Sequence, residues 1–234
     1  MAQKKLLRFA EIKTYPHVFE YPKHMMGKWR EFFKNDAPVI LELACGRGEY
    51  TVGLAKMFPE KNFIGVDVKG NRMYIGAKKT LQEKMPNTAF LRTQIEMLAE
   101  YFEPGEVDEI WITFPDPQLR TSKAKRRLTH PRFLRLYQQI LKPGGLIHLK
   151  TDSPVLFAFT KLVIEIYQLQ MAEECDNVHG STIVKPELQI ITHYESLDIA
   201  QSRTVFYLQF TLPGEIKMID DQLQKLLKHE EQAD

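Results

Sequence analysis

The sequence predicts an α/β fold in which helices cover both faces of a mostly parallel sheet. Apolar runs of strand length, such as 38–44 and 62–68, recur along the chain. Segments with helical spacing of apolar residues separate these runs, for example 49–58. Such alternation is typical of parallel sheets, and the right-handed connections between parallel strands give a doubly wound sandwich.

The individual elements follow from local patterns. The run 38–44 ends in a glycine-rich turn, and 107–114 is rich in β-branched and aromatic residues, as strands are. Ser153 is expected to cap a helix that begins at Pro154. The predicted strands are 38–44, 62–68, 88–94, 107–114, 146–149 and 204–210. The predicted helices are 49–58, 70–85, 131–141, the apolar stretch after Ser153, and 214–234, with a turn at 142–145.

Length and composition fit one globular domain. The chain has 234 residues, of which 44% are hydrophobic and 26% charged. We expect a basic N-terminal arm with a short helix over 1–37 and a single domain over 38–234. Cys45 and Cys175 are too few for a disulfide framework or a zinc site, which favours a cytoplasmic setting. The sequence has no secretory signal and no apolar run of about 18 residues, so no membrane association is expected.

The turn after the first predicted strand has the composition of a ligand site. It reads Glu42-Leu-Ala-Cys-Gly46-Arg-Gly48, and glycines let a backbone approach a ligand closely. Doubly wound folds bind ligands at this edge of the sheet. Asp67 ends the second predicted strand about 20 residues later, which is the position of a ribose-binding acid. We therefore predict that Gly46, Gly48 and Asp67 bind a cofactor.

Two features favour S-adenosylmethionine over NAD. Thr51 stands where a dinucleotide fingerprint needs a third glycine or alanine. Glu42 lies inside the first strand, where its carboxylate can meet a methionyl ammonium but would be an awkward neighbour for a pyrophosphate. A tight turn without a ligand is the alternative, although an unpaired buried carboxylate would then be expensive.

Asp116 follows the strand at 107–114, the strand end expected to lie beside the reacting group. Prolines on both sides restrict its backbone and help to fix its carboxylate. A basic cluster follows at once, and five positive charges within eight residues beside a pocket indicate a phosphate-rich substrate. A plain turn followed by a solvated loop is the alternative. The cluster comprises Arg120, Lys123, Lys125, Arg126 and Arg127.

Five motifs together resemble the bacterial tRNA (guanine-N7)-methyltransferases. The resemblance covers roughly 35–211, and its most specific part is 114–152. It implies a Rossmann-like class I methyltransferase fold with seven strands, the last ones antiparallel. It also implies methyl transfer from S-adenosylmethionine to N7 of the tRNA variable-loop guanosine, without a metal. The motifs are Glu-Leu-Ala-Cys-Gly-Arg-Gly, Phe-Pro-Asp-Pro, Lys-Arg-Arg-Leu-Thr-His-Pro-Arg-Phe-Leu, Leu-Lys-Pro-Gly-Gly and His-Leu-Lys-Thr-Asp.

The resemblance also implies roles for single residues. Glu42 and Asp67 match the cofactor-binding acids, and Gln94 stands where an adenine contact is expected. Asp116 matches the catalytic residue and is expected to contact the cofactor as well. Because guanine N7 has a lone pair, alignment should supply most of the rate, and Asp116 is expected to accept hydrogen bonds from the guanine N1–H and N2 edge. The implied substrate contacts are Arg120, Asp152, Thr192 and Glu195.

The sequence departs from the family pattern at several positions. Gln-Leu-Arg-Thr-Ser-Lys replaces the usual Pro-Trp-Pro-Lys-Lys-Arg after Pro117, so a tryptophan is missing. Gln94 replaces an aspartate, and Ala44 replaces the first glycine of the cofactor turn. The run after Glu195 also differs. These changes bear on substrate detail more than on the type of reaction.

Three alternative functions stay open at this point. One is a methyltransferase that acts on another RNA or a small molecule, which the basic loop disfavours. Another is an NAD-dependent oxidoreductase, which Thr51 disfavours, and the third is an inactive RNA-binding module, which the retained acids disfavour. The expected partner is tRNA, and the chain should work as a monomer or homodimer without an obligatory protein partner.

Overall fold

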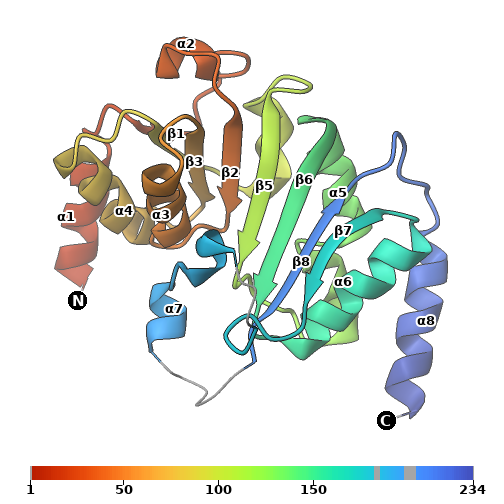
Figure 1. Ribbon diagram of the computed structural model, residues 1–234. Helices are drawn as coiled ribbons and strands as arrows, with labels where there is room; N and C mark the ends of the chain where they lie inside the picture. The colour runs from red at the N-terminus through yellow and green to blue at the C-terminus, as the bar shows by residue number, and fades with distance from the viewer. Residues whose placement is uncertain (1, 182–184, 198–203, 234) are drawn as a thin grey trace.

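A computed structural model describes residues 2–181, 185–197 and 204–233. These residues form an eight-stranded sheet with the order β1-β4-β3-β2-β5-β6-β8-β7 and the helices that cover it (Figure 1). The strands are β1 (Val18–Glu20), β2 (Val39–Leu43), β3 (Asn62–Asp67), β4 (Thr88–Arg92), β5 (Val107–Thr113), β6 (Leu141–Thr151), β7 (Gln170–Cys175) and β8 (Phe206–Thr211).

The sheet confirms the predicted doubly wound topology. Its pairings are parallel except at β8, which runs antiparallel to both β6 and β7. The chain moves outward from β2 through β3 and β4 and then returns to β5 on the other side of β2. The strand order therefore reverses between β2 and β5. The sheet has one strand more than the seven that the family resemblance implied, because Val18–Glu20, within the expected arm, pairs with β4.

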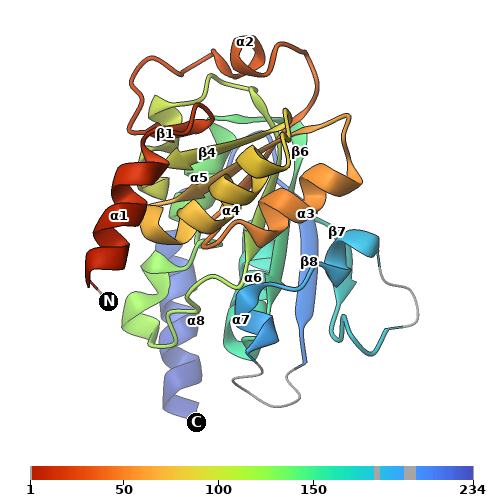
Figure 2. The same cartoon turned by 90° about the vertical axis from the view of Figure 1, so that its left-hand side faces the viewer.

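Helices cover both faces of the sheet. The helices α3 and α4 pack on one face, with α1 against α4, and α5 and α6 pack on the other face (Figure 2). The helices are α1 (Ala2–Ile12), α2 (Trp29–Phe33), α3 (Glu49–Met57), α4 (Gly70–Gln82), α5 (Pro131–Gln138), α6 (Pro154–Ile166), α7 (His193–Ser196) and α8 (Asp220–Ala233). Short 3₁₀ helices are η1 (Ile95–Glu100), η2 (Thr121–Arg126) and η3 (Pro186–Gln189).

Burial on both faces explains why the central strands are continuous apolar runs. Every residue of β2 is buried. Leu41 belongs to the cluster formed with α5 and α6, whereas Ile40 packs with Tyr50 and Leu54 of α3. Glu42 is the exception within this strand. Since side chains alternate along a strand, Glu42 faces the same side as Ile40, toward α3.

The predicted helix cap at Ser153 is confirmed, and the predicted turn at 142–145 is wrong. Ser153 Oγ accepts from Leu156 N at 3.2 Å. Residues 142–145 lie within β6 as a bulge, because Val107 pairs with Leu141 whereas Glu109 pairs with Leu146. The Pro-Gly-Gly sequence therefore distorts the strand without ending it.

The N-terminal segment is an integral part of this domain. Glu11 of α1 accepts hydrogen bonds from the hydroxyls of Tyr15, at 2.7 Å, and Tyr74 of α4, at 2.6 Å. Trp29 of α2 is completely buried, and its indole N–H donates to Tyr101 O at 2.8 Å. The segment 1–37 was expected to be a basic arm with a short helix, and its described residues 2–37 supply the helices α1 and α2 and the edge strand β1.

Candidate active site

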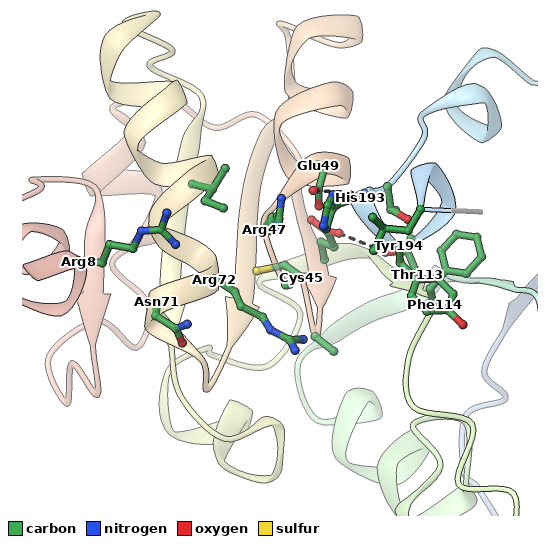
Figure 3. Close-up of a pocket in the computed structure, with 16 residues that line it drawn as sticks. Arg8, Cys45, Arg47, Glu49, Asn71, Arg72, Thr113, Phe114, His193 and Tyr194 are labelled. Carbon is green, nitrogen blue, oxygen red and sulfur yellow. Dashed lines mark hydrogen bonds between the residues drawn. The ribbon is translucent and has the colours of Figure 1, made fainter. Parts of the chain in front are cut away.

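The candidate active site lies at the carboxyl ends of the parallel strands, where the strand order reverses. A cavity of about 470 Å³ opens there. Its walls come from the ends of β2 and β5, the glycine turn, the starts of α3 and α4, and residues of α1 and α7 (Figure 3). Ligands of doubly wound folds bind at this place.

Glu42 forms part of the cavity wall and is held by two threonines. Its Oε2 accepts from Thr51 N at 2.7 Å and from Thr51 Oγ1 at 2.5 Å, while Oε1 accepts from Thr113 Oγ1 at 3.1 Å. Glu42 is 4% exposed, and burial raises the pKa of its carboxyl to about 8. A carboxylate oxygen can accept two hydrogen bonds, so Oε1 keeps one acceptor site. Thr51, which spoils the dinucleotide fingerprint, therefore positions the acid expected to bind an ammonium.

The glycine turn has a left-handed backbone and is tied to β3. Gly46 and Gly48 have φ values of +56° and +74°, and a Cβ at Gly48 would lie 2.7 Å from a ring atom of Phe90. Asp67 Oδ2 accepts from Gly46 N at 2.9 Å. Ala44 also has a left-handed φ, of +56°, although it carries a Cβ. The left-handed backbone at position 44 thus explains why the family pattern has a glycine there, because a glycine adopts this conformation without the strain that the Cβ of alanine causes.

A second cavity, of about 350 Å³, brings together three residues that the sequence analysis singled out. Asp67, Gln94 and Asp116 all line it. Asp67 Oδ1 accepts from Lys69 N at 2.7 Å, and Gln94 is exposed at the start of η1. The two cavities adjoin, since both are lined by Ala44, Arg72 and Phe114.

Asp116 is exposed in a loop with an unusual backbone. Its Oδ1 accepts from Gln118 N at 3.0 Å, which closes a small turn. Phe114 and Gln118 have φ values of +46° and +48°. Left-handed residues other than glycine are uncommon and cluster at functional sites.

The basic cluster comprises three exposed residues, the half-buried Lys123 and one buried residue. Arg120, Lys125 and Arg126 are exposed, and Arg126 lines the second cavity. Arg127 is 2% exposed, and its guanidinium donates to backbone carbonyls of 117–119. The expectation that Arg127 holds tRNA phosphate does not fit this position, because the side chain is buried and its Nε and Nη2 donate to carbonyls within the protein.

Thr192 and Glu195 form the capping box of α7. Thr192 Oγ1 accepts from Glu195 N at 3.1 Å, and Glu195 Oε2 accepts from Thr192 N at 2.8 Å. Glu195 Oε1 lies 2.9 Å from Nζ of Lys150, which is completely buried. Thr192 also lines the first cavity. Both side chains thus shape α7, and this segment is fixed to β6 through Lys150.

Asp152 lies at the same edge of the sheet as Asp116. It follows β6 directly, and β6 pairs in parallel with β5, the strand that leads to Asp116. Asp152 is partly exposed. The sequence-predicted acids of the substrate side therefore come from neighbouring strand ends.

The first cavity has an acidic side and a basic side. Figure 3 shows Glu49 beside His193, and Glu49 Oε1 accepts from His193 N at 3.3 Å. Arg8 of α1 and Arg72 of α4 line the other side (Figure 3). Nothing in the local sequence of these residues indicates that α1 and α4 reach the glycine turn, so their place at the cavity could not be predicted.

Two features are not found in the part of the chain that the structure describes. Residues 2–181, 185–197 and 204–233 contain no group of three or more His, Cys, Asp or Glu side chains that could hold a metal ion. None of the helices formed by these residues is long and apolar enough to cross a membrane.

Comparisons with known proteins agree with this geometry. Residues 36–208 match a protein family described as "Putative methyltransferase". A tRNA (guanine-N(7)-)-methyltransferase of Bacteroides thetaiotaomicron is 50% identical over 92% of this chain and 88% of its own length. The enzyme of the same name from Porphyromonas gingivalis is 52% identical over 86% of each chain.

A solved structure supports the fold. A 30S ribosomal A1408 methyltransferase from an uncultured bacterium superimposes with a TM-score of 0.59, covering 80% of this chain and 93% of its own. At 19% identity this likeness concerns the fold alone. It confirms the predicted methyltransferase-type α/β sheet.

Proposed function

The chain belongs to the tRNA (guanine-N(7)-)-methyltransferase family, and we infer that it transfers a methyl group from S-adenosylmethionine to N7 of the variable-loop guanosine of tRNA. The observation that carries this inference is the meeting of Glu42, Asp67 and Asp116 around two adjoining cavities. These three acids come from three different strand ends. Each has a different task in the proposed reaction.

The charges of the first cavity fit the methionyl part of S-adenosylmethionine. Glu42 keeps an acceptor site on Oε1, and Glu49 adds negative charge on the same side. An ammonium group is the natural partner of a buried carboxylate that lacks a cation. Arg8 and Arg72 on the opposite side suit a carboxylate. We therefore assign the methionyl ammonium to Glu42 and the methionyl carboxylate to the arginine side.

The second cavity fits the nucleoside part of the cofactor. Asp67 is the acid at the end of β3 and is oriented by Gly46 N and Lys69 N. Its oxygens keep acceptor sites for ribose hydroxyls. Gln94 can donate to or accept from an adenine edge. The glycine turn holds Asp67 in place and thus links the two parts of the cofactor site.

S-adenosylmethionine, when bound, supplies an electrophilic methyl group. The chain itself has to orient the guanine, because N7 carries a lone pair and no proton has to be removed from it first. Asp116 accepts hydrogen bonds from the N1–H and N2 edge of the base and favours the positive charge that grows on it. A guanosine in the tRNA tertiary structure must be unstacked to react, at a cost of a few kcal/mol.

The exposed basic residues of the loop bind the tRNA backbone. Arg120, Lys125 and Arg126 are exposed, and Arg126 lines the second cavity. Asp152 is a further candidate for the guanine edge. Thr192 and Glu195 fix α7 at the wall of the first cavity. We propose that they also contact the tRNA substrate directly. We also propose that the protein works in the cytoplasm, where tRNA is, as a monomer or homodimer without a metal.

The test is methyl transfer from labelled S-adenosylmethionine to unmodified tRNA transcripts. The product base is mapped by the strand cleavage that 7-methylguanosine permits. We expect incorporation at one variable-loop guanosine. Incorporation only into another RNA or a small molecule would support the methyltransferase activity but contradict the proposal that tRNA is the substrate. A failure to bind S-adenosylmethionine would overturn the roles of Glu42 and Asp67.

A further inference from the structure

Arg127 is a buried cation in the middle of an exposed basic cluster. Its Nε donates to Pro117 O at 3.2 Å and Gln118 O at 3.3 Å. Its Nη2 donates to Gln118 O at 3.1 Å and Leu119 O at 3.3 Å. One guanidinium therefore holds three successive carbonyls of the loop that carries Asp116. A lysine could not reproduce this contact, because a single ammonium lacks the planar fork.

The loop needs such an anchor. Phe114 and Gln118 both have left-handed φ values, which cost free energy in residues with a Cβ. Gln118 links the strained backbone to Asp116, because its N–H donates to Asp116 Oδ1 and its carbonyl accepts from Arg127. A shift of this peptide unit would therefore move the carboxylate.

The Arg127 side chain is itself held by a contact with α6. Its guanidinium carbon lies 4.4 Å from the ring centroid of Phe159 on α6, a distance suited to a cation–π contact. The Phe159 ring stacks on His130, whose Nδ1 accepts from Arg132 N and caps α5. The helices α5 and α6 thus set the position of the loop through the Arg127 side chain, which Phe159 and His130 hold in place.

We propose that Arg127 is a positioning residue that holds Asp116 in its reactive place through the backbone of 117–119. This inference rests on the proposed function for the role of Asp116. It does not require that Arg127 touch the tRNA. Its neighbour Arg126 is exposed. The proposed function gives Arg126 a direct contact with the tRNA backbone, so the two adjacent arginines have different tasks.

The test compares Arg127→Lys and Arg127→Ala with Arg126→Ala as the matched control. Arg127→Ala and Arg126→Ala remove the same charge at adjacent positions. We expect Arg127→Lys to lower kcat about tenfold and Arg127→Ala about 100-fold, the loss that a misplaced catalytic group can cause. KM for tRNA and its dependence on salt should change little. Arg126→Ala should instead raise KM and reduce the slope of log affinity against log salt by about one.

A second readout does not depend on activity. Amide hydrogen exchange at Gln118, Leu119 and Arg120 should become faster in Arg127→Lys, and stay unchanged in Arg126→Ala. Ethylguanidinium should partly restore kcat in Arg127→Ala, whereas ethylammonium should not. If Arg127→Ala fails to fold, Arg127→Lys carries the exchange and kinetic comparison alone.

Two results would overturn the proposal. One is a salt slope that falls by about one in the Arg127 variants, which would make Arg127 a phosphate contact. The other is unchanged amide exchange with unchanged kcat in Arg127→Lys. If the wild-type chain does not methylate tRNA, the proposed function fails while the exchange experiment still decides whether Arg127 holds the loop.

Discussion

The cofactor end and the substrate end of the site hold their acids in different ways. Glu42 is 4% exposed and accepts hydrogen bonds from both Thr51 and Thr113. Asp116 is exposed, and its contact is to Gln118 N within the same loop. The cofactor acid is thus built into strands and a helix, whereas the substrate acid depends on a strained loop. The cofactor acid is therefore positioned by direct side-chain contacts, whereas the substrate acid is positioned through the backbone of its loop, which Arg127 anchors.

The largest expected effect separates the two ends. Asp116→Ala should lower kcat by about 100-fold or more, because it removes a preorganised electrostatic contact to the guanine edge. Binding of S-adenosylmethionine, measured by calorimetry, should weaken much less than in the Glu42 variant described next. Loss of cofactor binding in Asp116→Ala, to the same extent as in that variant, would show that the two ends are not separate.

Removing the charge of Glu42 tests the cofactor end. Glu42→Gln keeps the shape of the side chain but loses the ionic contact to the methionyl ammonium, worth about 2 kcal/mol or roughly 30-fold in Kd. The thermal stability of the free protein should not fall, since the variant no longer buries an ionisable carboxyl. Glu49→Gln, on the same cavity side, is the control and should have a smaller effect. An unchanged Kd in Glu42→Gln would contradict the assignment.

The pH dependence of cofactor binding sharpens the same point. Burial raises the pKa of Glu42 to about 8, so the free protein holds a proton there at neutral pH. The ammonium contact favours the carboxylate, and binding therefore releases that proton. Affinity should rise with pH, by up to about tenfold per unit between pH 6 and 8, and level off above. Calorimetry in two buffers of different ionisation enthalpy counts the released proton. Glu42→Gln should abolish this pH dependence, and a persistent slope there would assign it to another group.

The smallest expected effect concerns the backbone of the cofactor turn. Ala44 has a φ of +56°, so Ala44→Gly should stabilise the protein by up to about 1 kcal/mol. Ala10→Gly in the helical, exposed part of α1 is the control and should destabilise by about 0.5–1 kcal/mol. Denaturant titration measures both. A destabilising Ala44→Gly would mean that the turn is not strained by its Cβ.

Local patterns were enough to predict the centre of the fold and the cofactor turn. The strand β2 can be recognised from adjacent residues alone, because burial on both faces of the sheet demands a continuous apolar run. The glycine turn that follows it can be recognised in the same way. The edge strand β7 was missed. Its residues Gln170–Cys175 alternate between partial and full exposure, so they carry no apolar run, and long-range pairing with β8 makes them a strand.

The features that the sequence did not reveal depend on contacts between residues far apart in the chain. Arg126 and Arg127 are adjacent in one basic run, so the local sequence does not tell them apart. The packing of Phe159 and the hydrogen bonds to the carbonyls of 117–119 distinguish the buried Arg127 from the exposed Arg126. The pairing of Lys150 with Glu195 joins two elements far apart in the chain. Arg8 lay in a segment expected to be an arm, and its place at the cavity depends on the packing of α1 against α4.

The most direct test of the central claim changes one atom of the substrate. A tRNA with 7-deazaguanosine at the variable-loop position has a carbon in place of N7 and keeps the Watson–Crick edge that Asp116 is proposed to bind. We predict that this tRNA binds with the affinity of the unmodified transcript, inhibits its methylation competitively, and accepts no labelled methyl group. Methyl transfer to the 7-deazaguanosine tRNA at the normal rate would contradict the account, because the acceptor atom would then lie elsewhere.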